Sequence, residues 1–235
     1  PRRGRFDKGV SIEKPTLGTT LSLLHQQRAF WWIAGGCSFT AFISYGNGNF
    51  FPSYLMRSHN MSISEVGFAL AAVSGVAGAI GTFGGGVLAD FLGKTDKRWY
   101  VWVPILGNVI ALPFMAYAIF SDRTEWILYV LFPANILNSL YLGPSIALCH
   151  TLVTPRMRAM TSAILFLVIN MIGLGAGPLI VGLLSDAFAD SLGAQNLRAA
   201  MLIVLFFGFV VGNGCFVMAT KSLNSTGDRS ARRVD

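Results

Sequence analysis

Six long apolar segments, separated by short polar stretches, form the dominant pattern of this chain. An α-helix of about 20 mainly apolar residues is long enough to cross the hydrocarbon core of a bilayer. Apart from His150, none of the six segments contains an Asp, Glu, Lys, Arg or His side chain. The pattern predicts an all-α membrane protein with six transmembrane helices, at roughly Phe30–Leu55, Val66–Ala89, Trp99–Phe120, Trp126–Val153, Ala159–Ser185 and Ala199–Ala219.

The composition favours lipid as the surrounding solvent. Hydrophobic residues make up 53% of the 235 residues, and charged residues make up 12%, about half the usual share in a soluble domain. One large or two small soluble domains would not need this much apolar surface. We therefore expect an integral, multi-pass membrane protein.

The basic residues are divided unequally between the two sides of the predicted membrane. With six spans both termini lie on one side, and of the 18 Lys and Arg residues only Arg57, Arg123 and Arg198 fall on the other. Loops rich in Lys and Arg stay in the cytoplasm, so both termini are expected there, with the protein in the cytoplasmic (inner) membrane. The net charge of +7 is then an orientation signal, and nucleic acid is not an expected partner.

The apolar segments divide the chain into three parts. Residues 1–28 form a basic linker with Gly and Pro, residues 29–220 form the six-helix unit, and residues 221–235 form a tail. The linker lacks the apolar core and small-residue cleavage site of a signal peptide. Because the chain opens with Pro1 and this linker, we expect it to be part of a longer protein.

Two of the segments carry groups of polar residues, which are costly inside a membrane and are often functional. In the fourth segment these residues are three or four positions apart and therefore share one helix face. In the first segment, Ser44 and two Asn residues precede a group of aromatic residues. They either bond across helices or line a hydrated cavity, and the shared face favours a substrate cavity formed by Asn47, Asn49, Phe50, Tyr54, Asn135, Asn138, Tyr141 and Ser145.

Small residues indicate where helices approach one another in lipid. The second segment has them at four-residue steps, and the fifth has a glycine group just before Pro178, which predicts a kink. Each set is explained either by static packing or by a surface on which helices move. The sets are Gly67, Ala71, Gly75 and Ala79, then Gly81 and Gly85, then Gly173, Gly175 and Gly177.

Enzyme chemistry has no support in the sequence. There is no HExxH, no GxSxG, no phosphate-binding loop and no pair of intramembrane carboxylates. Ser145 and His150 are five residues apart, about half a turn out of phase on a helix, and the three Cys residues fit neither zinc nor a disulfide framework. We expect no enzyme activity, no cofactor and no metal site.

The loop after the second segment reads GGGVLADFLGKTDKR, from Gly84 to Arg98. It resembles the signature loop of the major facilitator superfamily, which lies between the second and third helices of each six-helix half. Phe91 stands where the family often has Arg, a variant typical of second halves. The resemblance implies helices 7–12 of the family fold, with an N-terminal six-helix half as partner. The matching residues are Gly86, Leu88, Ala89, Asp90, Gly93 and Lys94.

A narrower resemblance concerns the substrate. The stretches TPRMRAMTSAI and GLGAGPLIVGLLSD resemble the spinster branch of the superfamily, which implies export of an amphipathic, lysolipid- or sphingolipid-like molecule. Membrane lipids and this substrate are then the expected partners. The alternatives are a multidrug/proton antiporter of the same superfamily and, in another class, a six-helix channel or structural membrane subunit.

The family resemblance implies transport by alternating access between two six-helix halves. Asp90 would meet the positively polarised start of a helix in the other half, with Arg158 as a second partner, or would merely cap a helix. Since the spans contain no carboxylate, protons are partners only if the missing half supplies the acid; otherwise transport is uncoupled. The predicted gating residues are Gly86, Asp90, Gly93, Lys94, Arg98 and Arg158.

Overall fold

The structure, a computed structural model, describes residues 16–59 and 61–231, and every regular element within them is helical. Residues 1–15 of the predicted linker and 232–235 of the predicted tail lie outside the described residues. The first long helix is α2 (Arg28–His59), preceded by a short helix, α1 (Leu17–Gln26). Five further long helical segments follow α2.

Three of these segments are built from several consecutive elements. The second segment comprises α3 (Ile63–Ala71), the π-helix η1 (Ala72–Val76) and α4 (Ala77–Leu92), and the third is α5 (Trp99–Phe120). The fourth is α6 (Thr124–Ser139) and α7 (Leu142–Thr151). The fifth comprises η2 (Pro155–Met157), α8 (Arg158–Asn170), the π-helix η3 (Met171–Ala176) and α9 (Gly177–Ala187), and α10 (Ala189–Leu192) and η4 (Gly193–Gln195) lead into the sixth, α11 (Asn196–Ala231).

The all-α membrane fold is confirmed. Each predicted span lies almost wholly within one of the long helical segments, and the third matches α5 at both ends. Within the described part of the chain, five segments are long and apolar enough to cross a membrane. The exception is α2, whose 32 residues extend about 48 Å at 1.5 Å per residue. It is long enough, but Ser, Tyr and Asn residues in its middle lower its hydropathy.

Helix α1 lies within the residues predicted as a linker and was not predicted. Thr16 caps it: the Thr16 hydroxyl accepts from the Thr19 backbone N–H, while the Thr19 hydroxyl accepts from the Thr16 N–H. Leu24 is fully buried, and its carbonyl accepts a hydrogen bond from the Trp31 indole at 3.1 Å. These contacts fix α1 against the start of α2.

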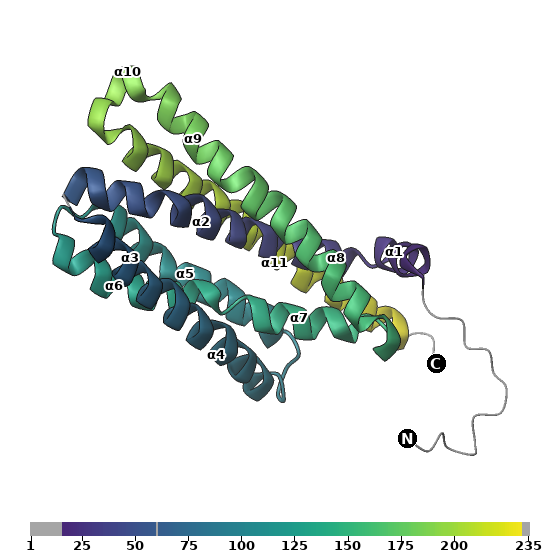
Figure 1. Cartoon of the computed structure of the whole chain (residues 1–235). Helices are drawn as coiled ribbons and strands as arrows, with labels where there is room; N and C mark the ends of the chain where they lie inside the picture. Colours follow the sequence, from purple (N-terminus) through teal and green to yellow (C-terminus); the bar gives the residue numbers. More distant parts are fainter. Residues whose placement is uncertain (1–15, 60, 232–235) are drawn as a thin grey trace, which may run out of the picture.

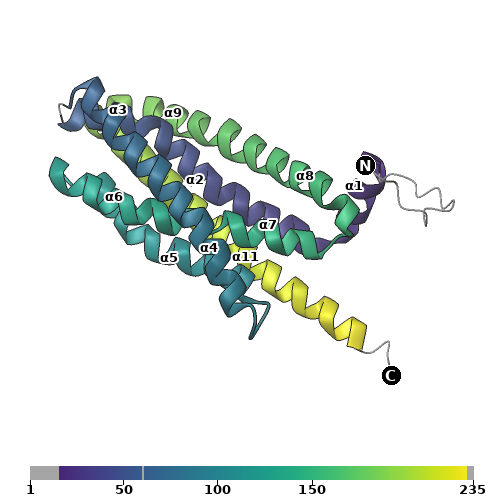
Figure 2. The same ribbon diagram turned by 60° about the horizontal axis from the view of Figure 1, so that its bottom comes forward.

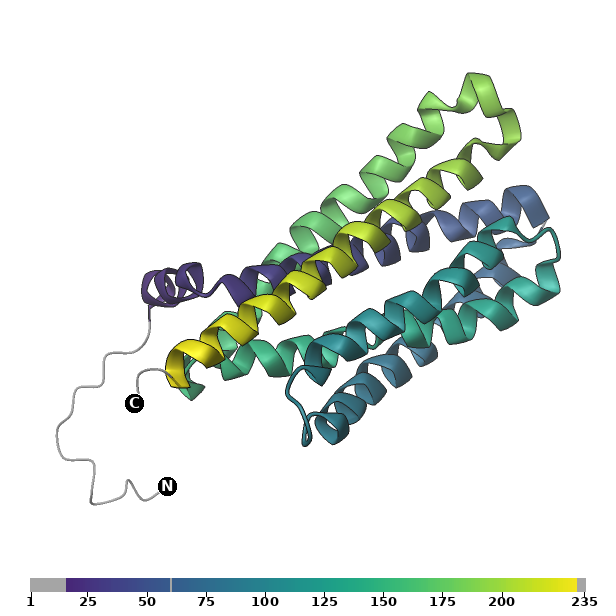
Figure 3. The same ribbon diagram turned by 180° about the vertical axis from the view of Figure 1, so that it is seen from behind.

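The long helices form two groups that pack side by side (Figures 1 and 3). In one group, α2 lies between α11 and the α8–η3–α9 segment. In the other, α5 packs against α6 and α4. Contacts of α5 with α11 and of α2 with α3 and α6 join the groups.

Figures 1 and 2 show α1 and the described end of α11 at the same end of the bundle, and Figure 1 shows α10 at the opposite end. We call these the α1 end and the α10 end. Two basic turns lie at the α1 end. The turn between α4 and α5 carries Lys94, Lys97 and Arg98, and η2 carries Arg156 just before α8 begins at Arg158. Arg57, Arg123 and Arg198 lie at the α10 end. The unequal charge distribution read from the sequence thus coincides with the two ends of the bundle.

The glycine group of the fifth segment forms the π-helix η3 and the start of α9. A Cβ on Gly177 would lie 2.9 Å from the Phe42 carbonyl oxygen and 3.0 Å from the Gly46 nitrogen. Only glycine lets α9 approach α2 this closely. π-Helical turns inside α-helices are often found at functional sites. The π-helix of the second segment, η1, contributes Val73 and Ser74 to the wall of a cavity.

Candidate functional site

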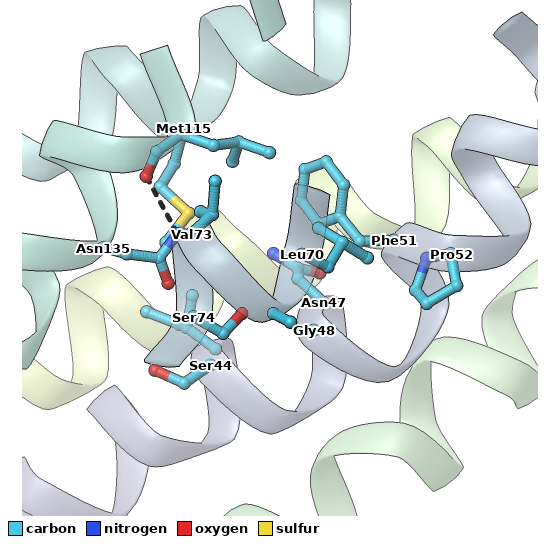
Figure 4. Close-up of a pocket in the computed structure, with 13 residues that line it drawn as sticks. Ser44, Asn47, Gly48, Phe51, Pro52, Leu70, Val73, Ser74, Met115 and Asn135 are labelled. Carbon is cyan, nitrogen blue, oxygen red and sulfur yellow. Dashed lines mark hydrogen bonds between the residues drawn. The ribbon is translucent and has the colours of Figure 1, made fainter. Parts of the chain in front are cut away.

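A cavity of about 320 Å³ lies between α2, the α3–η1 segment, α5 and α6. Most of its wall is apolar and includes Phe51, Leu70, Met115 and Leu131. Its polar side chains come from three helical segments and surround one space in Figure 4; they are Ser44, Asn47, Ser74 and Asn135. None of the residues that line this cavity, all within the described part of the chain, carries a charge.

Local sequence explains the space along α2. Gly48 has no side chain, and Pro52 has no backbone N–H to donate to the carbonyl four residues earlier, which loosens the helix there. Both residues line the cavity. The cavity therefore lies beside a part of α2 that lacks one side chain, at Gly48, and one backbone N–H, at Pro52.

Most of the polar groups near the cavity have partners. The Asn135 amide donates to the Leu131 carbonyl of its own helix at 2.9 Å. The Ser44 hydroxyl donates to Asn138 Oδ1 at 2.6 Å and so joins α2 to α6. Asn138 is buried and does not line the cavity. Its contact matches the alternative reading in which such residues bond across helices.

Asn47 differs from these residues. It lines the cavity and is only 2% exposed, yet neither its Nδ2 nor its Oδ1 has a hydrogen-bond partner. An unpaired buried amide costs about 1–3 kcal/mol. The cavity wall therefore contains one donor and one acceptor that the described protein groups leave unsatisfied.

The other predicted cavity residues lie elsewhere. Asn49 is exposed, and Phe50 packs against the hydrophobic core without lining the cavity. Ser145 is buried and Tyr141 is half-buried, nearer the α1 end. The polar residues predicted to share one face of the fourth segment, Asn135, Asn138, Tyr141 and Ser145, do not lie on one continuous helix. The reason is that α6 ends at Ser139 and α7 begins at Leu142, which changes the helical register. Only Asn47 and Asn135 of the predicted set line this cavity, and a binding role for the others stays a prediction.

Tyr54 forms part of a polar cluster at the α10 end. Its hydroxyl donates to the Ile119 carbonyl at 2.8 Å and accepts from the Arg198 guanidinium at 3.2 Å. Arg198 also pairs with Asp122 at 2.7 Å. The cluster joins α2, the turn after α5, and α11, so the position of Tyr54 suits a structural role.

Asp90 lies in the last turn of α4 at the α1 end and is exposed. Its carboxylate accepts a hydrogen bond from the Tyr100 hydroxyl at 2.7 Å. A Cβ on Gly93 would lie 2.6 Å from Cε2 of Tyr100, so glycine gives the ring room to reach Asp90. Arg158 is exposed, and among the described residues it forms no ion pair with Asp90.

The remaining residues of the predicted gating loop have local contacts. Lys94 lies over the Phe91 ring, 5.8 Å from its centroid. Arg98 lies 3.8 Å from Asp96, with both side chains about half exposed. Gly86 lies where α4 meets α7, because a Cβ on Gly143 would be 3.0 Å from the Gly86 nitrogen. These contacts hold the loop together and leave the Asp90 carboxylate exposed.

His150 forms a hydrogen bond of 2.7 Å with Ser162 and joins α7 to α8. In residues 16–59 and 61–231, no three His, Cys, Asp or Glu side chains come together in a group that could hold a metal ion. Cys37 and Cys149 are buried and all three cysteines are free thiols. The hydrogen bond between His150 and Ser162 is therefore a packing contact between α7 and α8.

Sequence reasoning missed several of the cavity residues. Ser74 is the first polar side chain after Glu65 in a glycine- and alanine-rich run, a signal that could have singled it out. Leu70 and Met115 had no distinguishing signal, because apolar residues occur throughout both segments. The π-helix that brings Val73 and Ser74 to the cavity has no sequence pattern of its own.

Comparison with known proteins shows a family match, a similar protein and similar solved structures. The family model described as Major Facilitator Superfamily matches residues 1–178. An MFS-type efflux pump of Mycolicibacterium smegmatis is 35% identical over 211 residues, which cover 89% of this chain and 48% of that protein. The crystal structure of a bacterial homolog to human lysosomal transporter, Spinster, in an inward-facing and unoccupied conformation matches with a TM-score of 0.82 and 25% identity.

That structural match covers 94% of this chain and 54% of the other chain. A crystal structure of a bacterial homolog to human lysosomal transporter, Spinster, in an inward-facing and occupied conformation matches with a TM-score of 0.76 and 26% identity, over 85% of this chain and 50% of the other. The chain therefore spans about half the length of the relatives it matches.

Proposed function

The chain belongs to the major facilitator superfamily, and we propose from that premise that it is the C-terminal half of a secondary transporter that exports an amphipathic, lipid-like molecule. The half is completed by an N-terminal six-helix half. The two halves rock around a substrate site by alternating access. The same proposal places the α1 end, with both chain termini, in the cytoplasm.

The cavity lining is the observation that carries this proposal. A lipid-like molecule has a long apolar part and a small polar part, and the cavity offers Phe51, Leu70 and Met115 together with amides and hydroxyls. A permanently cationic drug would need an acidic partner to offset its desolvation, because the single aromatic ring of the lining, Phe51, offers a cation–π contact worth only about 2 kcal/mol. None of the lining residues is acidic. An uncharged or weakly polar ligand is the better fit.

The descriptions of the relatives also support a transporter that exports its substrate. The Mycolicibacterium smegmatis protein carries the description of an efflux pump, and the structural neighbours are described as homologs of a lysosomal transporter, Spinster. The efflux-pump likeness also favours a second candidate, a multidrug/proton antiporter. Because the predicted spans of this half contain no carboxylate, proton coupling would depend on an acid in the other half.

A transport assay separates the two candidates. The complete transporter, containing this chain and its N-terminal half, is reconstituted in proteoliposomes. We expect faster export of a fluorescent monoacylglycerol, an uncharged amphipathic lipid, than in empty liposomes, and no comparable export of ethidium. Export of ethidium alone would favour the drug antiporter, and export of neither compound would contradict the proposed function.

A further inference from the structure

The side-chain amide of Asn47 is buried and has no hydrogen-bond partner among the described residues. Both amide atoms are buried without a partner, and the residue forms part of the wall of a 320 Å³ cavity. Membrane proteins hold such a group only at a cost in free energy, because lipid offers no replacement hydrogen bonds. A ligand that donates one hydrogen bond and accepts another would remove that cost.

The neighbouring groups do not satisfy Asn47. Ser44 donates to the Thr40 carbonyl and to Asn138, and the Asn135 amide donates to Leu131. Figure 4 shows Asn47 and Asn135 on different helices around the same space, with Ser74 also facing it. Ser74 is exposed and lines the cavity. None of these groups satisfies Asn47, and the cavity beside it is the space that its amide would face if the side chain turned.

We propose that Asn47 determines the specificity of this cavity, and that its ligand carries, beside an apolar chain, an uncharged group that both donates and accepts a hydrogen bond, such as a carboxamide. The inference rests on the proposed transport function. The Asn47 side chain reaches the ligand by turning about its own bonds, since the residue is already part of the wall. The apolar chain of the ligand lies against Phe51, Leu70 and Met115.

Charge supports an uncharged head. The ionisable groups nearest along α2 and α11, Arg57 and Arg198, line a different pocket at the α10 end and not this cavity. A charged head would therefore enter the cavity without a counter-ion, and that desolvation is costly. An amide avoids this cost and pairs with both atoms of Asn47.

The test compares two probes with the same chain. Oleamide has a carboxamide that donates and accepts, whereas methyl oleate only accepts. Binding to the purified complete transporter in lipid nanodiscs is measured with radiolabelled oleamide and by competition with methyl oleate. Since an unpaired buried polar group costs about 1–3 kcal/mol, oleamide should bind about 5- to 150-fold more tightly.

Asn47→Leu should abolish this preference and leave methyl oleate binding within about twofold of wild type. The variant should fold, because an apolar residue of similar size replaces an unsatisfied amide. Asn213→Leu is the matched control: Asn213 Oδ1 is also buried without a partner, but the residue lies on α11 and does not line the cavity. It should keep the preference for oleamide.

Three results would overturn the inference: equal binding of the two probes to wild type, binding of neither probe, or a preference that survives in Asn47→Leu. If water alone occupies the cavity, the first or second result is obtained. Export of the fluorescent monoacylglycerol is measured on the same preparation. Export without the amide preference would refute the role of Asn47 and keep the transport function, whereas the reverse outcome would refute the transport function.

Discussion

Gly85→Ala is expected to destabilise the helix bundle strongly. A Cβ at Gly85 would overlap the carbonyl oxygen of Leu140 and lie 2.8 Å from its Cα. These are backbone atoms in the break between α6 and α7, so they move only if the fourth helical segment shifts away from α4. Overpacking of this kind costs about 1–3 kcal/mol, and each kcal/mol lowers the melting temperature by about 2–4 °C in a chain of this size.

The adjacent glycine provides the control. A Cβ at Gly84 would have no atom within 4 Å, and alanine is the better helix former. Gly84→Ala should therefore leave the melting temperature of the purified transporter unchanged or slightly raised. The measurement is thermal unfolding of both variants in the same nanodiscs. Equal effects of the two substitutions would show that the close packing of α4 against the α6–α7 break is not needed for stability.

Asp90→Asn is expected to slow transport markedly while the protein remains folded. Asp90 lies at the carboxyl end of α4, where the helix dipole disfavours a negative charge, and the carboxylate is exposed. We propose that the positively polarised start of a helix in the other half binds the Asp90 carboxylate and offsets this unfavourable interaction. That interaction is worth up to about 2 kcal/mol, which is up to about a thirtyfold change in the ratio of the two states.

Asp96→Asn is the control for this prediction, because it makes the same change of charge in the loop that follows α4. Among the described residues, the Asp96 side chain contacts Arg98 and the backbone beside it, so export of the fluorescent monoacylglycerol should stay near the wild-type rate. Export by Asp90→Asn should fall severalfold or more, with an unchanged melting temperature. Comparable export by the two variants would remove Asp90 from the gating mechanism.

The membrane spans were predictable because the bilayer imposes a length and an apolar composition on each one. The predicted segment Trp99–Phe120 matches α5 at both ends, since charged or polar residues flank it closely. Helix α11 extends to Ala231, well beyond the predicted end at Ala219, because its last turns are polar and give no hydropathy signal. Helix α1 was missed for a similar reason: it is short, and it is held by Thr16 and by Trp31 of the next helix.

The site was less predictable, because identical residue types have different surroundings. Asn47 and Asn138 are both buried amides in polar stretches of their helices. Asn138 accepts from Ser44, whereas Asn47 has no partner. That difference depends on how α2 is rotated against α6 and on the π-helix η1 beside the cavity. Neither the rotation of α2 nor the π-helix follows from the spacing of residues along one helix. Of the four polar residues predicted on one face of the fourth segment, Asn135 therefore lines this cavity and the other three do not.

The most direct test of the account is whether the cavity opens alternately to the two sides of the membrane. Ser74→Cys places a reporter thiol in the cavity wall, while native Cys37 and Cys149 are buried. The thiol is labelled with a small, membrane-impermeant methanethiosulfonate from either side, in the complete transporter with and without Asp90→Asn. A transporter lacking Ser74→Cys gives the background from half-buried Cys215.

The account predicts reciprocal changes: in Asp90→Asn the labelling rate rises from the α1 end and falls from the α10 end. Rates that change in the same direction at both ends, or that do not change at all, would contradict alternating access around this cavity.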